Sequence, residues 1–148
     1  MNSFAPVDPD YAKRVRDAFE RQRIMTWIGA TLTQLGPGHC EITLPHKPEL
    51  TQQHGYIHGG IIGTIGDTAA GFAAYTLMPH DAGVLTVEYK MNIMAPADGE
   101  MLISRGEVIR AGRSLVVAKA DVFAVKAGRQ THCACLLQTL MTMRGGAA

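Results

Sequence analysis

A histidine, two glycines and a lone carboxylate are the residues in this sequence best suited to chemistry. His58, Gly59 and Gly60 lead into an apolar run in which Asp67 is the only acidic residue. If the run is a helix, its first backbone N–H groups lack partners within the helix, and the helix dipole favours negative charge there. Glycine lets a ligand approach that backbone closely. This segment therefore predicts a site that stabilises an oxyanion.

Asp67 lies eight residues after Gly59. Burying an ionised carboxylate without a partner is costly, so Asp67 must be paired, protonated or functional, and a place in a buried network is the structural alternative. A functional Asp67 would suit a general base or a nucleophile. Along one helix the two residues are about 12 Å apart, so one reacting carbonyl cannot touch both. If they cooperate, Asp67 of one subunit must face Gly59 of another in a symmetric dimer.

The first half of the chain must position these residues. Residues 9 to 25 have the periodicity of an amphipathic helix. Two short runs, 27 to 35 and 39 to 44, flank a Gly-Pro-Gly turn and predict a hairpin, and residues 45 to 57 predict a loop. Residues 58 to 77 are apolar on all sides, which predicts a buried helix. Its glycines each cost about 1 kcal/mol relative to alanine, and we expect close approach of other backbone to offset that cost.

The second half reads as four strands, at 84 to 94, 100 to 109, 114 to 125 and 130 to 143. Short turns between them favour antiparallel pairing. The whole pattern predicts an α+β fold in which five or six antiparallel strands wrap around one long central helix. The length of 148 residues predicts a single domain, 1–148.

The spacing of these motifs resembles a known family. His58-Gly59-Gly60 followed by Asp67 in a helix of small residues, with Gln52 seven residues before Gly59, is similar to hotdog-fold thioesterases of the phenylacetic acid degradation (PaaI) type. The similarity continues through residues 83 to 96, the turn at 98 to 99 and the turn at 112 to 113. The resemblance implies the hotdog fold, a homodimer or a dimer of such dimers, and hydrolysis of acyl-CoA thioesters to a carboxylic acid and coenzyme A.

The resemblance also implies a role for each residue of the site. The Gly59 N–H would polarise the thioester carbonyl, and Asp67 of the partner chain would act as nucleophile or as general base on water. Gln52 would hold the water or the carbonyl, although many relatives carry Asn there. His58 would orient the thioester, and Thr86 would bind the attacking water. Direct attack and a covalent intermediate both stay open.

A basic turn is the expected handle for coenzyme A, because the planar guanidinium of arginine suits phosphate. The resemblance places this turn at the nucleotide end of coenzyme A and the pantetheine arm along residues 86 to 88. The residues expected to contact coenzyme A are Gly60, Val87, Glu88, Arg110, Gly112, Arg113 and Ser114. The acyl group, aromatic or short to medium aliphatic, would lie near Trp27, Phe72 or Tyr75. Coenzyme A is part of the substrate, and neither a metal nor another cofactor is expected.

Two other functions fit the same residues. A hotdog-fold enoyl- or hydroxyacyl-CoA hydratase-dehydratase would use His58 and Asp67 as its acid and base. A non-catalytic acyl-CoA-binding module would bind without turnover. A DNA-binding regulator is disfavoured, because the N-terminal segment has room for one helix and not for a helix-turn-helix unit.

Charge and composition limit the classes of binding partner and the cellular location that the sequence predicts. The formal net charge of +1 gives no general attraction to nucleic acid or to a membrane surface. Residues 57 to 78 are long enough to span a bilayer, but His58 and Asp67 make that costly. The N-terminus lacks the apolar core of a signal peptide, and the three cysteines are expected to be reduced. These features predict a cytoplasmic protein.

Overall fold

The structure, a computed structural model, describes residues 3–145. Its elements in chain order are α1 (Tyr11–Arg21), α2 (Arg23–Ile28), β1 (Thr31–Gly36), β2 (His39–Pro45), a 3₁₀ turn (Pro48–Leu50), α3 (Gly59–Tyr75), β3 (Ala82–Ile93), β4 (Met101–Ala111), β5 (Leu115–Lys126) and β6 (Arg129–Arg144). None of the described helices is long and apolar enough to cross a membrane.

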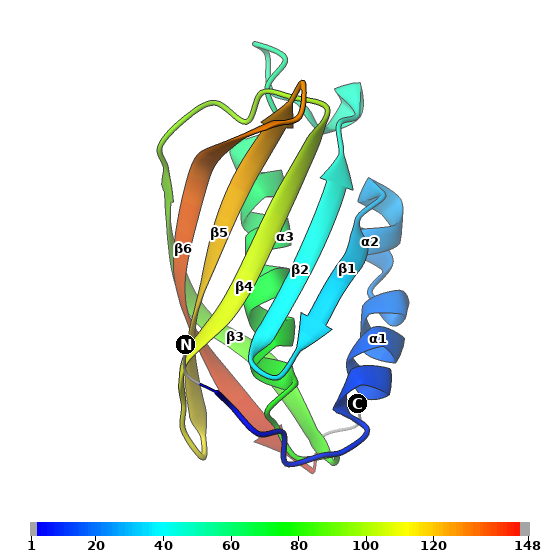
Figure 1. Cartoon of the computed structure of the whole chain (residues 1–148), viewed down its shortest axis with the longest axis vertical. Coiled ribbons are helices and arrows are strands. Elements are labelled where there is room, and N and C mark those ends of the chain that lie inside the picture. Colours follow the sequence, from blue (N-terminus) through cyan, green and yellow to red (C-terminus); the bar gives the residue numbers. More distant parts are fainter. Residues whose placement is uncertain (1–2, 146–148) are drawn as a thin grey trace.

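The six strands form one antiparallel sheet in the order β1-β2-β4-β5-β6-β3, and the sheet wraps around α3 (Figure 1). Alternate residues of β5 are buried against the helix, as their spacing predicts. The predicted α+β hotdog arrangement is confirmed.

The N-terminal helix differs from its prediction. It is two helices, because the chain leaves the helical conformation at Gln22, where φ is −78° and ψ is 92°. The second helix runs to Ile28 and ends at Gly29, which has a left-handed φ of 84°. The first strand therefore starts at Thr31 and not at residue 27. Both helices lie beside β1 in Figure 1.

Glycines set the distance between α3 and the sheet. A Cβ added at Gly106 on β4 would lie 2.2 Å from the Ala69 carbonyl oxygen, so the backbones of strand and helix touch there. The helix glycines make room for side chains instead. A Cβ at Gly66 would meet Leu136 at 2.7 Å, and one at Gly63 would meet the Tyr89 hydroxyl at 2.9 Å. The expected close backbone contact thus occurs, but it requires the glycine of the strand rather than those of the helix.

Arg14 of α1 fixes the C-terminal end of α3. Its Nη2 donates to the carbonyl oxygens of Met78 at 2.9 Å and Tyr75 at 3.3 Å, and its Nε pairs with Asp8 at 2.8 Å. A cation is favourable at a helix C-terminus, where the carbonyl groups lack partners. The hydrogen bond from Arg14 lowers the pKa of Asp8. Arg14 and Asp8 thus hold α1 against the central helix.

Candidate active site

The carboxylate of Asp67 lies where α3, β3 and β6 meet. Its Oδ1 accepts hydrogen bonds from Thr86 Oγ1 at 2.6 Å and from Gln138 Nε2 at 2.5 Å. Gln138 Nε2 is also 3.1 Å from Thr86 Oγ1, so the three side chains form a closed triangle. Oδ2 makes no hydrogen bond or ion pair within residues 3–145. One oxygen of Asp67 is fixed, and the other is available to a ligand.

A β-bulge directs Thr86 toward Asp67. In the pairing of β3 with β6, Thr86 is opposite Leu140 while Glu88 is opposite Thr139, so Val87 is an extra residue. Beyond the bulge it is Tyr89, and not Glu88, that faces α3, since the Tyr89 hydroxyl reaches Gly63. Glu88 accepts a 3.3 Å hydrogen bond from Thr139 instead. Val87 and Glu88, both predicted to contact coenzyme A, are exposed.

A pocket of about 330 Å³ adjoins this triangle. Its lining residues are Gln22, Asp67, Thr68, Gly71, Phe72, Val84, Leu85, Thr86 and Leu140. Of the three aromatic residues expected near the acyl group, Phe72 lines the pocket. Trp27 is 71% exposed on α2, and Tyr75 is buried against the guanidinium of Arg14, so neither of these lines it.

His58 closes the N-terminus of α3. Its Nδ1 accepts a hydrogen bond from the Gly60 N–H at 2.8 Å, and its carbonyl oxygen accepts from the N–H groups of Ile61 and Ile62. Nδ1 is therefore unprotonated in this arrangement. The Gly59 N–H makes no hydrogen bond with the described part of the chain. Gly59 is thus the donor open to a ligand, while the side chain of His58 occupies the donor of Gly60.

Gln52 lies in the loop that precedes α3. Its side-chain Oε1 accepts from the His54 N–H at 2.5 Å, and its backbone N–H donates to Tyr56 at 2.9 Å. An isolated bridge between Thr51 and Ile57 closes this loop. The carbonyl end of the Gln52 amide is used within the loop, and its Nε2 makes no hydrogen bond within the described residues.

The predicted basic turn connects β4 and β5. Arg110, Gly112, Arg113 and Ser114 are all exposed. The Gly112 N–H donates to the Leu115 carbonyl oxygen at 2.9 Å. A Cβ at Gly112 would lie 2.5 Å from the same oxygen, so the tight turn requires glycine. A second pocket of about 330 Å³ brings Gly112 and Arg113 together with Arg144 and with Met78, beyond the C-terminal end of α3.

Within one protomer the predicted residues fall into separate groups. Asp67 and Thr86 are in contact, whereas His58, Gly59 and Gly60 lie about 12 Å away along α3. The basic turn is near the opposite end of that helix from Gly59.

Gln138 and Arg144 were not predicted as site residues. Gln138 did leave a signal in the sequence, because it is the polar member of an alternating stripe with Ala134, Leu136 and Leu140.

Comparisons with known proteins agree with this fold. The Thioesterase superfamily model matches residues 54–130, slightly more than half of the chain. The crystal structure of a thioesterase family protein from Silicibacter pomeroyi is 45% identical, with a TM-score of 0.90, and the match covers 91% of this chain and 99% of that one. The PaaI protein from the phenylacetic acid degradation operon of E. coli has a TM-score of 0.80 over 94% of this chain and 96% of that one.

That PaaI protein is 16% identical, so its likeness concerns the fold alone. A protein of Halobacterium salinarum that carries an esterase name is 28% identical over 118 residues, which are 76% of this chain and 78% of that protein. The family match contains Gly59, Asp67 and Thr86, and its extent, together with the 45% identical structure, shows the family. The chain belongs to the thioesterase superfamily and has the hotdog fold.

Proposed function

We propose that this protein hydrolyses acyl-CoA thioesters to a carboxylic acid and free coenzyme A, with Asp67 as the reacting carboxylate. The observation that carries the proposal is the Asp67 triangle, in which neutral donors hold Oδ1 while Oδ2 stays open beside a pocket. Such a carboxylate can take a proton from water or attack the carbonyl carbon itself. Neither route needs a metal or a redox cofactor.

The Gly59 N–H is the proposed oxyanion donor, and a second copy of the chain is needed to use it. Gly59 and Asp67 of one protomer are too far apart for one carbonyl, at about 12 Å. An antiparallel pair of α3 helices about a two-fold axis would bring Gly59 of one subunit near the partner's Asp67.

Strand β3 supports this self-association. It is an edge strand of the sheet, and a long apolar edge favours pairing with another chain. Its exposed apolar residues are Leu85 (47%), Val87 (57%), Tyr89 (44%) and Ile93 (51%). A homodimer through β3 would cover these side chains, and pairing of two such dimers would give the dimer of dimers that the resemblance allows beside the simple dimer.

The nucleotide end of coenzyme A is proposed to lie at the basic turn. Arg113 of the turn and Arg144 of β6 line one pocket, and Arg110 lies on β4 just before the turn, so the phosphates would meet guanidinium groups from the turn and from two strands. The pantetheine arm would then pass along residues 86 to 88 toward Asp67. Ser114 would contribute a backbone contact at one end, and Gly60 would meet the substrate through its Cα, because its N–H donates to His58 Nδ1.

The acyl group is proposed to occupy the pocket beside Asp67. A protein cavity of about 150 Å³ accepts a benzene ring, and this pocket has about twice that volume, 330 Å³. The size favours an aromatic or a short to medium aliphatic acyl group over a long fatty acyl chain.

The first test is release of free thiol from acetyl-, hexanoyl-, phenylacetyl- and palmitoyl-CoA. We expect turnover of at least one of the first three, and a loss of about 10²- to 10⁴-fold in Asp67→Asn. An enzyme-only blank is needed because Cys135 is partly exposed, whereas burial raises the pKa of Cys40 to about 12 and keeps it unreactive. No release from any substrate, or full activity in a folded Asp67→Asn, would overturn the proposal. Hydration of a 2-enoyl-CoA without thiol release would favour the hydratase.

The second test asks whether the site is shared. Gly59→Pro removes the N–H and should keep the helix, because proline is tolerated at the first helical position and the φ and ψ of His58, −61° and 140°, suit a residue before proline. Its ring also adds side-chain atoms, the first of which would lie 3.0 Å from the end of the Ile93 side chain. Gly59→Ala is the matched control, since it adds a Cβ and keeps the N–H. We expect Gly59→Pro to be inactive and Gly59→Ala to be active.

Mixing the Gly59→Pro and Asp67→Asn proteins distinguishes a site shared between two subunits from a site contained in one subunit. In a randomly exchanged mixture about a quarter of the sites would combine an intact Gly59 with the partner's intact Asp67. Activity should therefore return to roughly that fraction of wild type. If mass spectrometry shows that mixed dimers form and no activity returns, the two groups do not cooperate across subunits.

A further inference from the structure

Gln138 of β6 is a buried amide in contact with the proposed reacting group. Its side chain is 1% exposed, and its Nε2 contacts Asp67 Oδ1, Thr86 Oγ1 and, at 3.4 Å, the Asp67 carbonyl oxygen. We propose that Gln138 is a positioning residue that fixes Asp67 through Oδ1 and so makes Oδ2 the reacting oxygen. This inference rests on the proposed function, and it adds a residue that the family resemblance did not supply.

The direction of each hydrogen bond in the triangle follows from the donors available. The Thr86 hydroxyl has one proton and gives it to Asp67 Oδ1 at 2.6 Å, so its oxygen is left to accept from Gln138 at 3.1 Å. The second N–H of the amide goes to Oδ1. Turning the amide over would set its oxygen against a carboxylate oxygen, and two acceptors repel. Gln138 therefore orients both Thr86 and Asp67, and it does so when Asp67 is ionised.

The other end of the amide shows that stability alone does not explain this residue. Gln138 Oε1 is buried and has no hydrogen-bond partner among residues 3–145. A buried acceptor without a partner loses its hydration and gains nothing in return. The neighbouring positions of the same stripe, Leu136 and Leu140, carry apolar side chains that avoid this loss. The amide is therefore explained by what its nitrogen does at Asp67.

Few other groups near Asp67 can titrate. Thr68, Gln22 and Leu140, which line the pocket from α3, the α1–α2 junction and β6, are all uncharged. On β3 the titratable side chain that faces α3 is Tyr89, at Gly63, while Glu88 bonds to Thr139. Within the described residues, Asp67 is the one charged group lining the pocket of a single protomer. In a shared site the partner's His58 would be a second titratable group, so Asp67 is followed through the change in the pH profile between variants that all keep His58.

The test is Gln138→Met, which keeps the length of the side chain and removes the donor. Leu136→Met, two residues along the same stripe, is the matched control. For Gln138→Met we expect kcat to fall about 10- to 100-fold with KM changed less than about twofold, because the lost bonds act on the reacting group. The acid limb of the kcat profile should move to higher pH, since a carboxylate that loses donors binds its proton more tightly. The thermal midpoint should stay the same or rise, and Leu136→Met should leave kcat and the pH profile unchanged.

Two outcomes would overturn the inference. One is a folded Gln138→Met with wild-type kcat and pH profile. The other is a fall in kcat that accompanies a lower thermal midpoint without a shift of the acid limb, which would assign Gln138 a structural role. If the methionine variant does not fold, Gln138→Leu replaces it.

A carbon-13 NMR titration of the Asp67 carboxyl group separates this inference from the proposed function. The signal is assigned by its absence in Asp67→Asn, and the experiment needs no substrate. Its titration midpoint should move to higher pH in Gln138→Met even if no acyl-CoA of the panel is hydrolysed. If the protein hydrolyses acyl-CoA but the midpoint of Asp67 does not move in Gln138→Met, only the role of Gln138 is contradicted and the proposed function stands.

Discussion

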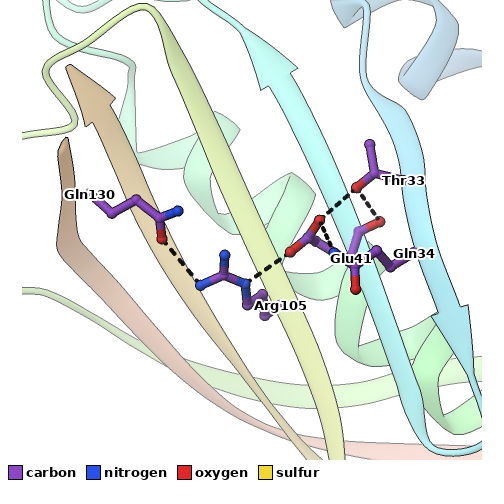
Figure 2. A network of polar contacts seen from close by, with 5 residues as sticks. All are labelled: Thr33, Gln34, Glu41, Arg105 and Gln130. Atoms are coloured by element: carbon purple, nitrogen blue, oxygen red, sulfur yellow. Dashed lines mark hydrogen bonds and ion pairs between the residues drawn. The ribbon is translucent and has the colours of Figure 1, made fainter. Parts of the chain in front are cut away.

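Two carboxylates of this protein lie in polar networks that connect neighbouring strands, and the groups that surround them differ. Asp67 faces the pocket side of the sheet, where Thr86 and Gln138 donate to one of its oxygens. Glu41 lies on the opposite face, where Arg105 Nε binds Oε2 at 2.9 Å (Figure 2). Gly106 of β4 touches α3, and successive residues of a strand point to opposite faces of the sheet. The preceding residue, Arg105, therefore points away from α3, on the same face as Glu41.

The Glu41 network leaves no oxygen of that carboxylate open. Thr33 and Gln34 donate to Oε1 at 2.9 and 3.1 Å, and Arg105 continues to the Gln130 side chain at 3.2 Å. Figure 2 shows these side chains reaching across the strands toward one another. Burial alone would raise the pKa of Glu41, which is 6% exposed, but the hydrogen bonds from Arg105 and Thr33 outweigh it and the pKa is lowered.

The difference separates a structural carboxylate from one available for chemistry. A cation stabilises a buried carboxylate strongly and also makes it a weak base. Neutral donors hold the ionised form with less loss of basicity and can be directed at one oxygen only. The Asp67 site therefore has the free oxygen and the neutral donors that a reacting carboxylate needs. The Glu41 site, in which a cation and neutral donors occupy both oxygens, is suited to stabilising the sheet.

The largest expected effect comes from giving Asp67 the cation that Glu41 has. Thr86→Lys would place an ammonium group in reach of Oδ1, and we expect the thioesterase kcat to fall by at least about 100-fold because an opposite charge weakens the base. Thr86→Val, which removes only the hydroxyl, should cost about 3- to 10-fold. Steady-state kinetics of both variants, with gel filtration to confirm assembly, checks the prediction. Equal losses in the two variants would show that the charge has no effect of its own.

Removing the charge of Glu41 should lower stability and leave catalysis intact. Breaking a buried ion pair costs up to about 3–5 kcal/mol, and we expect about 2 kcal/mol for Glu41→Gln because Arg105 remains about one-third exposed. Urea denaturation at neutral pH measures the free energy of unfolding, and thiol release measures the activity. Asp67→Asn should give the reverse pattern, and a large stability loss there would erase the distinction between the two sites.

The contribution of Glu41 should also depend on pH. Because its pKa is lowered on folding from the ordinary value of 4.5, the stabilisation is fully present above that value and is lost as pH falls through the lowered one. The difference in unfolding free energy between wild type and Glu41→Gln should be constant near neutral pH and shrink below about pH 4.5. Denaturation curves measured between pH 7 and pH 3 test this, and a difference that grows on acidification would contradict it.

The smallest effect is expected at an ion pair on the surface. Lys13 and Asp17 are four residues apart on α1 and largely exposed, so solvent screens their attraction. Lys13→Gln should leave the unfolding free energy unchanged within error, in the same denaturation experiment as Glu41→Gln. A loss as large as that of Glu41→Gln would mean that burial is not what distinguishes the Glu41 pair.

The sequence alone determined the central helix, the four strands that follow it and the residues that begin the site, whereas it missed the break at Gln22 that divides the N-terminal helix. The apolar run with one carboxylate predicted the buried helix, the alternation on β5 predicted its inner face, and the spacing from Gly59 to Asp67 pointed to a shared site. These features are local, since helix and strand periodicities repeat within a few residues of the chain. Thr86 came from the family resemblance, and the structure places it against Asp67.

Only the tertiary structure decided which side chains complete the site. Gln138 meets Asp67 across 71 residues of sequence, and the bulge at Val87 decides that Thr86 and Tyr89 face the helix while Glu88 does not. The side chain of His58 occupies the N–H of Gly60 and leaves that of Gly59 open. Such contacts depend on strand register, where a shift of one residue turns every side chain to the other face. No pattern within a single strand carries that information, because register is set between strands far apart in the chain.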